Sequence, residues 1–314
     1  MGSVLVFIDV PSLPLPRASR ELLALAATIG TPAVASPQPL SEDAAAELAG
    51  YGVQRIFEPS QPLPEVLVAA KAAFLAEAVR AAAPDAVLLG NSFEDREVAA
   101  RAGVKLGSGL ITDAVAVAPD LAVTKSVLAG SYTSTCRVKT GVPIITVKAN
   151  SVEPAERGAA GSPERSLVTV PETGPAAVVM ERSEKRVSGR PELSEARVIV
   201  AGGRGLDGDF GPVEELADLL GGAVGASRAA TDAGWIEHSA QVGQTGKTVS
   251  PQLYISAGIS GAIQQKAGMQ TAKVIVAVNK DADAPVFEIA DFGVVGDVFK
   301  VLPQAAEEIR KRRA

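Results

Sequence analysis

Residues 198–208 read VIVAGGRGLDG, an apolar run whose glycines at positions 203, 205 and 208 match the spacing G-x-G-x-x-G. The run predicts a buried strand, and Pro212–Leu220 predicts a helix after it. Glycines between a strand and a helix let backbone N–H groups approach a phosphate, and the helix N-terminus adds positive potential. We therefore expect a phosphate site here, with a glycine-rich turn that holds no ligand as the alternative.

Two polar segments follow in the same part of the chain. The next predicted strand ends at Ser227 and Arg228, where an NAD enzyme would carry an acidic residue for the ribose. An arginine instead suits a phosphate, a 2′-phosphate or an electron-rich ring, or it caps a strand end at the surface. Gln241–Lys247 (QVGQTGK) then gathers a hydroxyl, amides and an ammonium, which favours a polar ligand over a plain solvent-facing loop.

Gly258–Gln265 (GISGAIQQ) is a second candidate for a phosphate-binding turn. It follows the predicted strand Leu253–Ser256 and opens a helix. We expect Ser260 to cap that helix and to leave the N–H groups of Gly261 and Ala262 free for an anion.

The remaining candidates also follow predicted strands. Asn279 comes after Val274–Val278, and Asp291 and Phe292 come after Val286–Ile289. Apart from the Gln241–Lys247 loop, all these features fall at C-terminal strand ends, where parallel α/β sheets bind their ligands. The residues by themselves therefore predict a large phosphate-bearing nucleotide in the second half of the chain.

No catalytic set can be recognised. His238 is the one histidine and has no cysteine or second histidine beside it, so we predict no metal site and no catalytic residues. A redox carrier fits this absence, because its cofactor supplies the chemistry.

Strands and helices alternate along the first half, which implies βαβ units and a mostly parallel sheet. The predicted helices are 18–27, 42–48 and 64–82. The predicted strands are 3–10, 33–35, 55–58, 86–89, 111–117, 123–128, 133–139, 144–148, 167–170 and 177–187.

Gly189–Leu193 (GRPEL) is typical of a linker, and the strand–helix pattern restarts at Ala196–Ala201. We expect an α/β fold with two domains. Residues 1–189 would form a mostly parallel α/β sheet domain, and residues 190–314 a Rossmann-like, doubly wound domain.

Composition excludes several protein classes. The formal net charge of −6 argues against a nucleic-acid partner. Cys136 is the one cysteine, which excludes an internal disulfide and fits a reducing compartment. Ser3–Val10 predicts a first strand and not a leader, and no run of about 18 apolar residues predicts membrane insertion. We expect a cytoplasmic protein.

Five segments together closely resemble the C-terminal domain of electron-transfer flavoprotein alpha subunits: Gly202–Gly205, Val224–Ala229, Gln241–Lys247, Leu253–Met269 and Val278–Val301. They keep the family's order, whereas the first half of the chain is similar in strand pattern only. The resemblance implies an FAD-binding electron carrier with no substrate turnover of its own. It also implies a heterodimer with a beta subunit that carries AMP and contacts residues 1–189. Flavin dehydrogenases, such as the acyl-CoA dehydrogenases of fatty acid beta-oxidation, would be the donors, and a quinone oxidoreductase or similar protein the acceptor.

The resemblance assigns roles by position. The pyrophosphate side would take Arg204, Ser227, Ser260, Gly261 and Ala262. The isoalloxazine would lie against Arg228, Gln244 and Thr245, with the Thr245 hydroxyl near the ring nitrogen N5. The ribityl chain would meet Gln264, and the adenosine end Asn279, Asp291 and Phe292. The FAD site would be completed by Val242, Gly243, Ile263 and Gln265.

Departures from the family pattern leave alternatives open. The family usually has histidine at Gln265 and tyrosine at Phe292, and the loop after Gly205 is shorter than usual. The histidine-to-glutamine change bears on the redox chemistry. The main alternative is an NADP-dependent Rossmann oxidoreductase, suggested by the glycine fingerprint and Arg228. A third is a nucleotide-binding scaffold subunit that has lost redox function.

Overall fold

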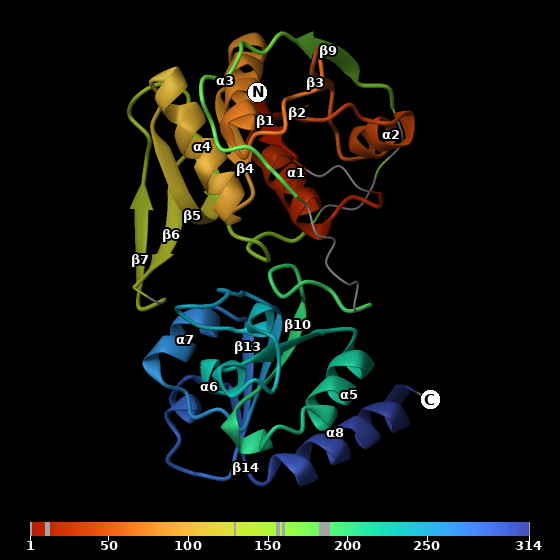
Figure 1. Ribbon diagram of the computed structural model, residues 1–314, viewed down its shortest axis with the longest axis vertical. Helices are drawn as coiled ribbons and strands as arrows, with labels where there is room; N and C mark the ends of the chain where they lie inside the picture. The colour runs from red at the N-terminus through yellow and green to blue at the C-terminus, as the bar shows by residue number, and fades with distance from the viewer. Residues whose placement is uncertain are drawn as a thin grey trace. The chain divides into compact units, whose positions relative to one another are not determined.

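The computed structural model describes residues 2–9, 13–128, 130–154, 158, 161–181 and 189–313. The chain divides into two compact units (Figure 1): residues 1–126 with 133–184, and residues 127–132 with 185–314. The predicted domain boundary at 189/190 stays a prediction.

The first unit is built on a nine-stranded sheet in the order β7-β6-β5-β8-β4-β1-β2-β3-β9. Its strands are β1 (Ser3–Phe7), β2 (Thr31–Ala35), β3 (Arg55–Pro59), β4 (Ala86–Leu89), β5 (Leu110–Val117), β6 (Val123–Val127), β7 (Tyr132–Cys136), β8 (Ile144–Val147) and β9 (Glu164–Val168). Its helices are α1 (Arg17–Ile29), α2 (Glu42–Gly50), α3 (Ala69–Ala82) and α4 (Phe93–Leu106). In the part of the sheet from β5 to β9, every strand runs parallel to its neighbours. The strands β5 and β6 run antiparallel to each other. The mostly parallel α/β sheet is confirmed.

Successive side chains of β1 enter two different cores. Val4 and Val6 pack with residues of α1 and α2, whereas Leu5 and Phe7 pack with residues of α3 and α4. Because helices cover both faces, the strands are continuously apolar and do not alternate with polar residues.

Three details differ from the sequence-based expectation. The helix α4 was not expected, because its buried positions are mostly small residues that give a weak apolar pattern. The predicted helix 64–82 begins only at Ala69, because Val66 makes an isolated bridge to Val178. In the predicted strand 177–187, residues 177–181 form only that bridge, and residues 182–187 lie outside the described residues.

The second unit has a five-stranded, all-parallel sheet in the order β11-β10-β12-β13-β14. Its strands are β10 (Val198–Gly202), β11 (Ala223–Ala226), β12 (Leu253–Ala257), β13 (Val274–Asn279) and β14 (Phe292–Val295). Its helices are α5 (Gly211–Leu220), α6 (Arg228–Asp232), α7 (Ile263–Met269) and α8 (Val298–Arg313). The strand order reverses direction between β10 and β12, which confirms the doubly wound fold and marks its switch point.

Two cores cover this second sheet. Val213 of α5 and Leu302 of α8 belong to one core together with Val200. Met269 of α7 belongs to the other core together with Ile199 and Tyr254. Side chains adjacent in β10 thus face different helices, as in the first unit.

The predicted strand 286–289 is wrong. Pro285–Ile289 forms a short 3-10 helix, in which Val286 packs with Ala277 and Ala284. The strand lies at Phe292–Val295, and Asp291 sets its start by bonding the Ile275 backbone through both its N–H and its carboxylate. The strand therefore ends at Val295, and Gly296 is the first residue after it.

Among the described residues, no helix combines the length and the apolar character needed to cross a bilayer.

Candidate functional site

A cavity of about 730 Å³ opens at the C-terminal ends of the second sheet. The segments that follow β10, β11, β12, β13 and β14 all contribute lining residues, as does the Gln241–Thr245 loop. The cavity therefore lies over the switch point between β10 and β12, where doubly wound sheets bind nucleotides. Its volume is within the range of small-molecule and cofactor sites.

Most of the predicted site residues line this cavity. They are Arg204, Ser227, Arg228, Val242, Gly243, Gln244, Thr245, Ser260, Ala262, Gln264, Gln265 and Asn279. Gly261 and Ile263 are not among the lining residues, although their neighbours are. Gly261 instead lies against the turn at Val286. A Cβ on Gly261 would be only 2.3 Å from the Val286 nitrogen.

Asp291 and Phe292 are not brought to the cavity. Phe292 pairs in register with Val276 and is 65% exposed on the edge strand. Asp291 precedes it, at the opposite end of the sheet from the cavity. Both were placed from the wrong strand position, so the structure gives no support for their contact with an adenosine.

The glycine fingerprint serves loop packing. The N–H groups of Gly203 and Gly205 donate to the carbonyls of Ala257 and Gly258, both at 3.0 Å. A Cβ on Gly205 would lie 2.8 Å from the Gly258 Cα. These N–H groups are thus already used, and the glycines let two strand ends touch at the floor of the site. The expectation that they face a phosphate is corrected.

The expected cap at Ser260 is also corrected. The N-cap residue of α7 is Ala262, with no side-chain hydrogen bond. The Ser260 carbonyl accepts from the Val286 N–H at 3.0 Å, which fixes the turn against the 3-10 helix. At the neighbouring strand end, the Ser227 hydroxyl is buried and has no partner. A buried hydroxyl without a partner is costly, so this group is available to a ligand in the cavity.

The Gln241–Lys247 loop is closed by its own backbone. Lys247 donates to the Gln241 carbonyl at 2.8 Å, and Gly243 donates to the Lys247 carbonyl at 3.1 Å. Gln244 ties the loop to α7 through a 2.7 Å bond to the Gln264 carbonyl. Inside the loop, the Gln241 amide nitrogen donates to the Thr245 hydroxyl at 2.9 Å. The loop therefore presents Gln244 and Thr245 on a fixed frame.

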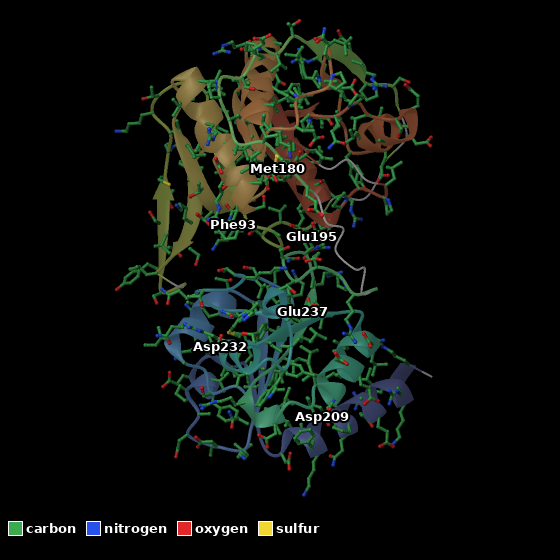
Figure 2. All side chains as sticks on the ribbon, viewed as in Figure 1. Phe93, Met180, Glu195, Asp209, Asp232 and Glu237 are labelled. Atoms are coloured by element: carbon green, nitrogen blue, oxygen red, sulfur yellow. The ribbon has the colours of Figure 1, made fainter. Side chains whose placement is uncertain are left out.

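Arg228 and Asp232 form the principal ion pair at the cavity wall. The Arg228 Nε lies 3.1 Å from the Asp232 carboxylate, one helical turn away, and the two side chains are 68% and 52% exposed. Asp232, labelled in Figure 2, ends α6. The pair is solvated, so its attraction is weak and the guanidinium remains able to turn toward a ligand.

Gln265 is buried at 7% exposure, and its amide nitrogen donates to the Tyr254 hydroxyl at 3.2 Å. Its amide oxygen has no partner. Complete burial raises the pKa of the Tyr254 hydroxyl, although the bond from Gln265 opposes the shift. The pair is therefore neutral at all ordinary pH values.

Asn279 acts as a brace between two turns. Its amide nitrogen donates to the Ile259 carbonyl at 2.9 Å, and its amide oxygen accepts from the Asp281 N–H at 3.0 Å. The side chain therefore holds the β12 and β13 strand ends together at the cavity wall.

Sequence reasoning missed several lining residues, above all Gly296–Phe299. They follow the true end of β14, where Asp297 caps α8 through a 2.9 Å bond from the Phe299 N–H. The signal was present as FGVV followed by Gly-Asp, an apolar strand before an N-cap. Asp207 and Asp232 also line the cavity, and nothing in their local pattern distinguishes them from surface acids.

In the described part of the chain, no cluster of histidine, cysteine or acidic residues could hold a metal ion. The site is instead rich in amides, hydroxyls and backbone turns. Such a set can bind a large polar ligand.

Comparison with known families identifies the ligand. Residues 192–270 match the model of the electron transfer flavoprotein FAD-binding domain, and residues 4–173 match the electron transfer flavoprotein domain. The chain belongs to the electron transfer flavoprotein alpha subunits. It is 43% identical to the electron transfer flavoprotein subunit alpha of Mycobacterium leprae over 321 residues, covering 100% of both chains. The corresponding protein of Mycobacterium tuberculosis is 44% identical, again over 100% of both chains. That of Bacillus subtilis is 38% identical over 85% of this chain and 84% of its own.

This alpha subunit binds FAD, and its family implies a beta-subunit partner and a role as a redox carrier. The cavity residues fit FAD. The unpartnered Ser227 hydroxyl can bond a phosphate, and the amides of Gln244 and Gln265 can bond ring carbonyls.

Proposed function

We propose that the cavity over the β10–β12 switch point holds the FAD, and that the chain passes electrons between other proteins without converting a substrate of its own. The single observation that carries this proposal is the gathering of the predicted FAD residues from separate loops around one cavity, with no acid–base pair among them. When bound, FAD supplies one- and two-electron redox chemistry.

We propose the following roles within the cavity. Ser227, Ser260 and Arg204 would hold the pyrophosphate, and Ala262 would approach it through its backbone. Arg228, Gln244 and Thr245 would hold the isoalloxazine. Gln264 would lie at the ribityl chain and Gln265 near the pyrimidine carbonyl of the ring. Asn279 would keep its hydrogen bonds to Ile259 and Asp281 and would lie beside the adenosine end of the cofactor. Its side-chain partners within the protein support a positioning role.

The more specific assignments of partner, electron donor, electron acceptor and location are also proposals. We propose a heterodimer in which the beta subunit carries AMP and contacts residues 1–189. Flavin dehydrogenases such as acyl-CoA dehydrogenases would donate electrons in fatty acid beta-oxidation, and a quinone oxidoreductase would accept them. The proposed location is the cytoplasm. These assignments rest on family membership.

The NADP-dependent oxidoreductase is not favoured. It does not account for the Gln241–Thr245 loop and the Gly258–Gln265 turn, which both contribute residues to the cavity lining. A scaffold without redox function would retain FAD that cannot be reduced reversibly.

Co-expression with the beta subunit tests the proposal. We expect a one-to-one yellow complex whose flavin absorbance bleaches with dithionite and returns with an oxidant, while the alpha subunit alone loses FAD. A colourless complex that binds NADPH would overturn the proposal. A yellow complex that does not bleach would favour the scaffold. Stopped-flow mixing with a reduced acyl-CoA dehydrogenase then tests the donor.

A further inference from the structure

Three polar side chains form a chain that runs from the core to the cavity. Thr231 and Gln241 are buried, at 2% and 6% exposure. The Thr231 hydroxyl lies 3.1 Å from the Gln241 amide oxygen, and the Gln241 amide nitrogen lies 2.9 Å from the Thr245 hydroxyl. Thr245 is exposed and lines the cavity.

The Gln241 backbone is fixed in the loop. Its N–H donates to the His238 carbonyl at 3.0 Å, and its carbonyl accepts from Lys247 at 2.8 Å. A Cβ on Gly246 would lie 2.4 Å from that carbonyl. The main freedom left to this residue is rotation of its terminal amide, which exchanges oxygen and nitrogen in place.

A count of protons shows that both amide orientations are possible. The Thr231 hydroxyl has one proton and two acceptors within reach, because it also lies 3.0 Å from the Arg228 carbonyl. With the amide nitrogen toward Thr245, one of these two contacts lacks a proton. With the amide turned over, Thr231 donates to Arg228, the amide nitrogen donates to Thr231, and Thr245 donates to the amide oxygen. All three contacts then have a proton.

The orientation of the amide decides what Thr245 offers to the cavity. In the first arrangement its oxygen accepts from Gln241, and its proton is free to donate to a ligand. In the second its proton is taken by Gln241, and its lone pairs are free to accept. The Thr245 oxygen keeps the same position in both.

We propose that Gln241 is a positioning residue that lets Thr245 donate to a ring nitrogen of oxidised FAD and accept from the same nitrogen in reduced FAD. The flavin nitrogen N5 is such an atom, since it is unprotonated in the oxidised cofactor and protonated in the fully reduced one. The inference rests on the proposed placement of the ring beside Thr245. Thr231 favours the accepting arrangement, and so favours the reduced cofactor.

The test uses the complete alpha–beta complex loaded with FAD labelled with ¹⁵N at N5. The variants are Gln241→Met, Thr245→Val, their double variant, and Gln252→Met as a control. Gln252 has a buried amide nitrogen without a partner, but it precedes β12 at the end of the sheet opposite the cavity. The N5 resonance is recorded in oxidised and reduced protein, with the midpoint potential and the FAD dissociation constant.

We expect Gln241→Met to move the N5 resonance in both redox states in the same direction as Thr245→Val, and the double variant to move it no further than Thr245→Val alone. The FAD dissociation constant should rise about two- to tenfold in Gln241→Met, as for loss of one neutral hydrogen bond. The control should match the wild type.

A second variant keeps the test decisive if Gln241→Met does not assemble. Thr231→Val removes only the preference for the accepting arrangement. It should therefore lower the midpoint potential while leaving the N5 resonance of the oxidised protein unchanged.

Additive shifts, or a wild-type N5 resonance in Gln241→Met, would overturn the role of Gln241 while leaving the FAD site intact. If Thr245→Val itself leaves N5 unchanged, the ring does not lie at Thr245, and both this inference and that part of the proposed site fail. An FAD-free wild-type complex would instead defeat the proposed function.

Discussion

Arg228 and Asp232 are two of the charged residues that line the cavity, together with Arg204, Asp207, Lys280, Asp281 and Asp297. Their ion pair is largely solvated, so each charge acts on the cavity through a high local dielectric. A positive charge near the ring favours the reduced, more negative cofactor. The potential of the flavin should therefore follow the net charge of this pair.

The first prediction follows from that pair. Arg228→Ala should lower the flavin reduction potential and weaken FAD binding, whereas Asp232→Asn should raise the potential. Both shifts should shrink as salt is added, because exposed charges are screened. Spectroelectrochemical titration at low and high ionic strength measures them. Shifts of the same sign in the two variants would contradict the account.

The second prediction concerns Gln265, which is buried and neutral beside Tyr254. Gln265→His introduces a group whose ordinary pKa is about 6.5, and burial at this position lowers the pH at which it titrates. Below that pH the imidazolium should stabilise the reduced ring, so the potential of the variant should rise above that of the wild type. Above it the two should converge.

The measurement is the midpoint potential from about pH 5.5 to 8, around the ordinary histidine pKa. Gln265→Asn is the matched control, because it keeps an uncharged amide and should add no pH dependence. Equal potentials of Gln265→His and the wild type at every pH would show that this residue does not act on the ring.

At the scale of the elements, α4 shows that a hydrogen-bonded N-terminal cap can start a helix whose apolar pattern is weak. The Ser92 hydroxyl accepts from the Asp95 N–H at 3.0 Å, and the Asp95 carboxylate accepts from the Ser92 N–H at 3.2 Å. This reciprocal cap starts a helix in which only Val98, Ala99, Ala102 and Gly103 are buried. The cap satisfies backbone donors that the sparse apolar stripe does not protect.

The third prediction tests this cap. Ser92→Ala should lower the free energy of unfolding of the first unit by about 1 kcal/mol, whereas Ser92→Thr should lose much less. Urea unfolding of the complex at fixed subunit concentration measures both. Equal losses in the two variants would mean that the hydroxyl does not hold the helix.

The elements also show how much of the site could be predicted from the sequence. The strand ends at Gly202, Ala226 and Ala257 follow unbroken apolar runs, so the loops after them were placed correctly. The last strand was misplaced, because PVFEI and FGVV both contain apolar runs. The contact of Val286 with Ala277 and the bonds between Asp291 and Ile275 select between them. The Ser227 hydroxyl and the Gln241 amide depend on burial by distant segments, which no local pattern reveals.

At the scale of the whole molecule, the match to the electron transfer flavoprotein domain ends at residue 173. The match to the FAD-binding domain begins at residue 192. Between these two regions, Arg190 pairs with Asp218 of α5 at 2.5 Å and so belongs to the second unit. We place the domain boundary at 189/190 as a proposal. The unit that binds FAD would then carry its own two cores.

The fourth prediction is that brief trypsin treatment of the complex cuts first at Lys185 or Arg186, next to the proposed boundary, because connections between separate cores are cleaved first. Mass spectrometry of the fragments locates the cut. Arg190 should resist trypsin, because Pro191 follows it and its side chain is ion-paired. First cleavage anywhere else in the chain would refute the boundary.

The central claim is that the cavity over the β10–β12 switch point is the FAD site. A crystal structure of the FAD-loaded complex with the beta subunit tests it most directly. We expect density for the isoalloxazine between Arg228, Thr245 and Gln265, with the pyrophosphate beside Ser227. Density for the flavin at any other place on this chain, with the cavity filled by water, would contradict it.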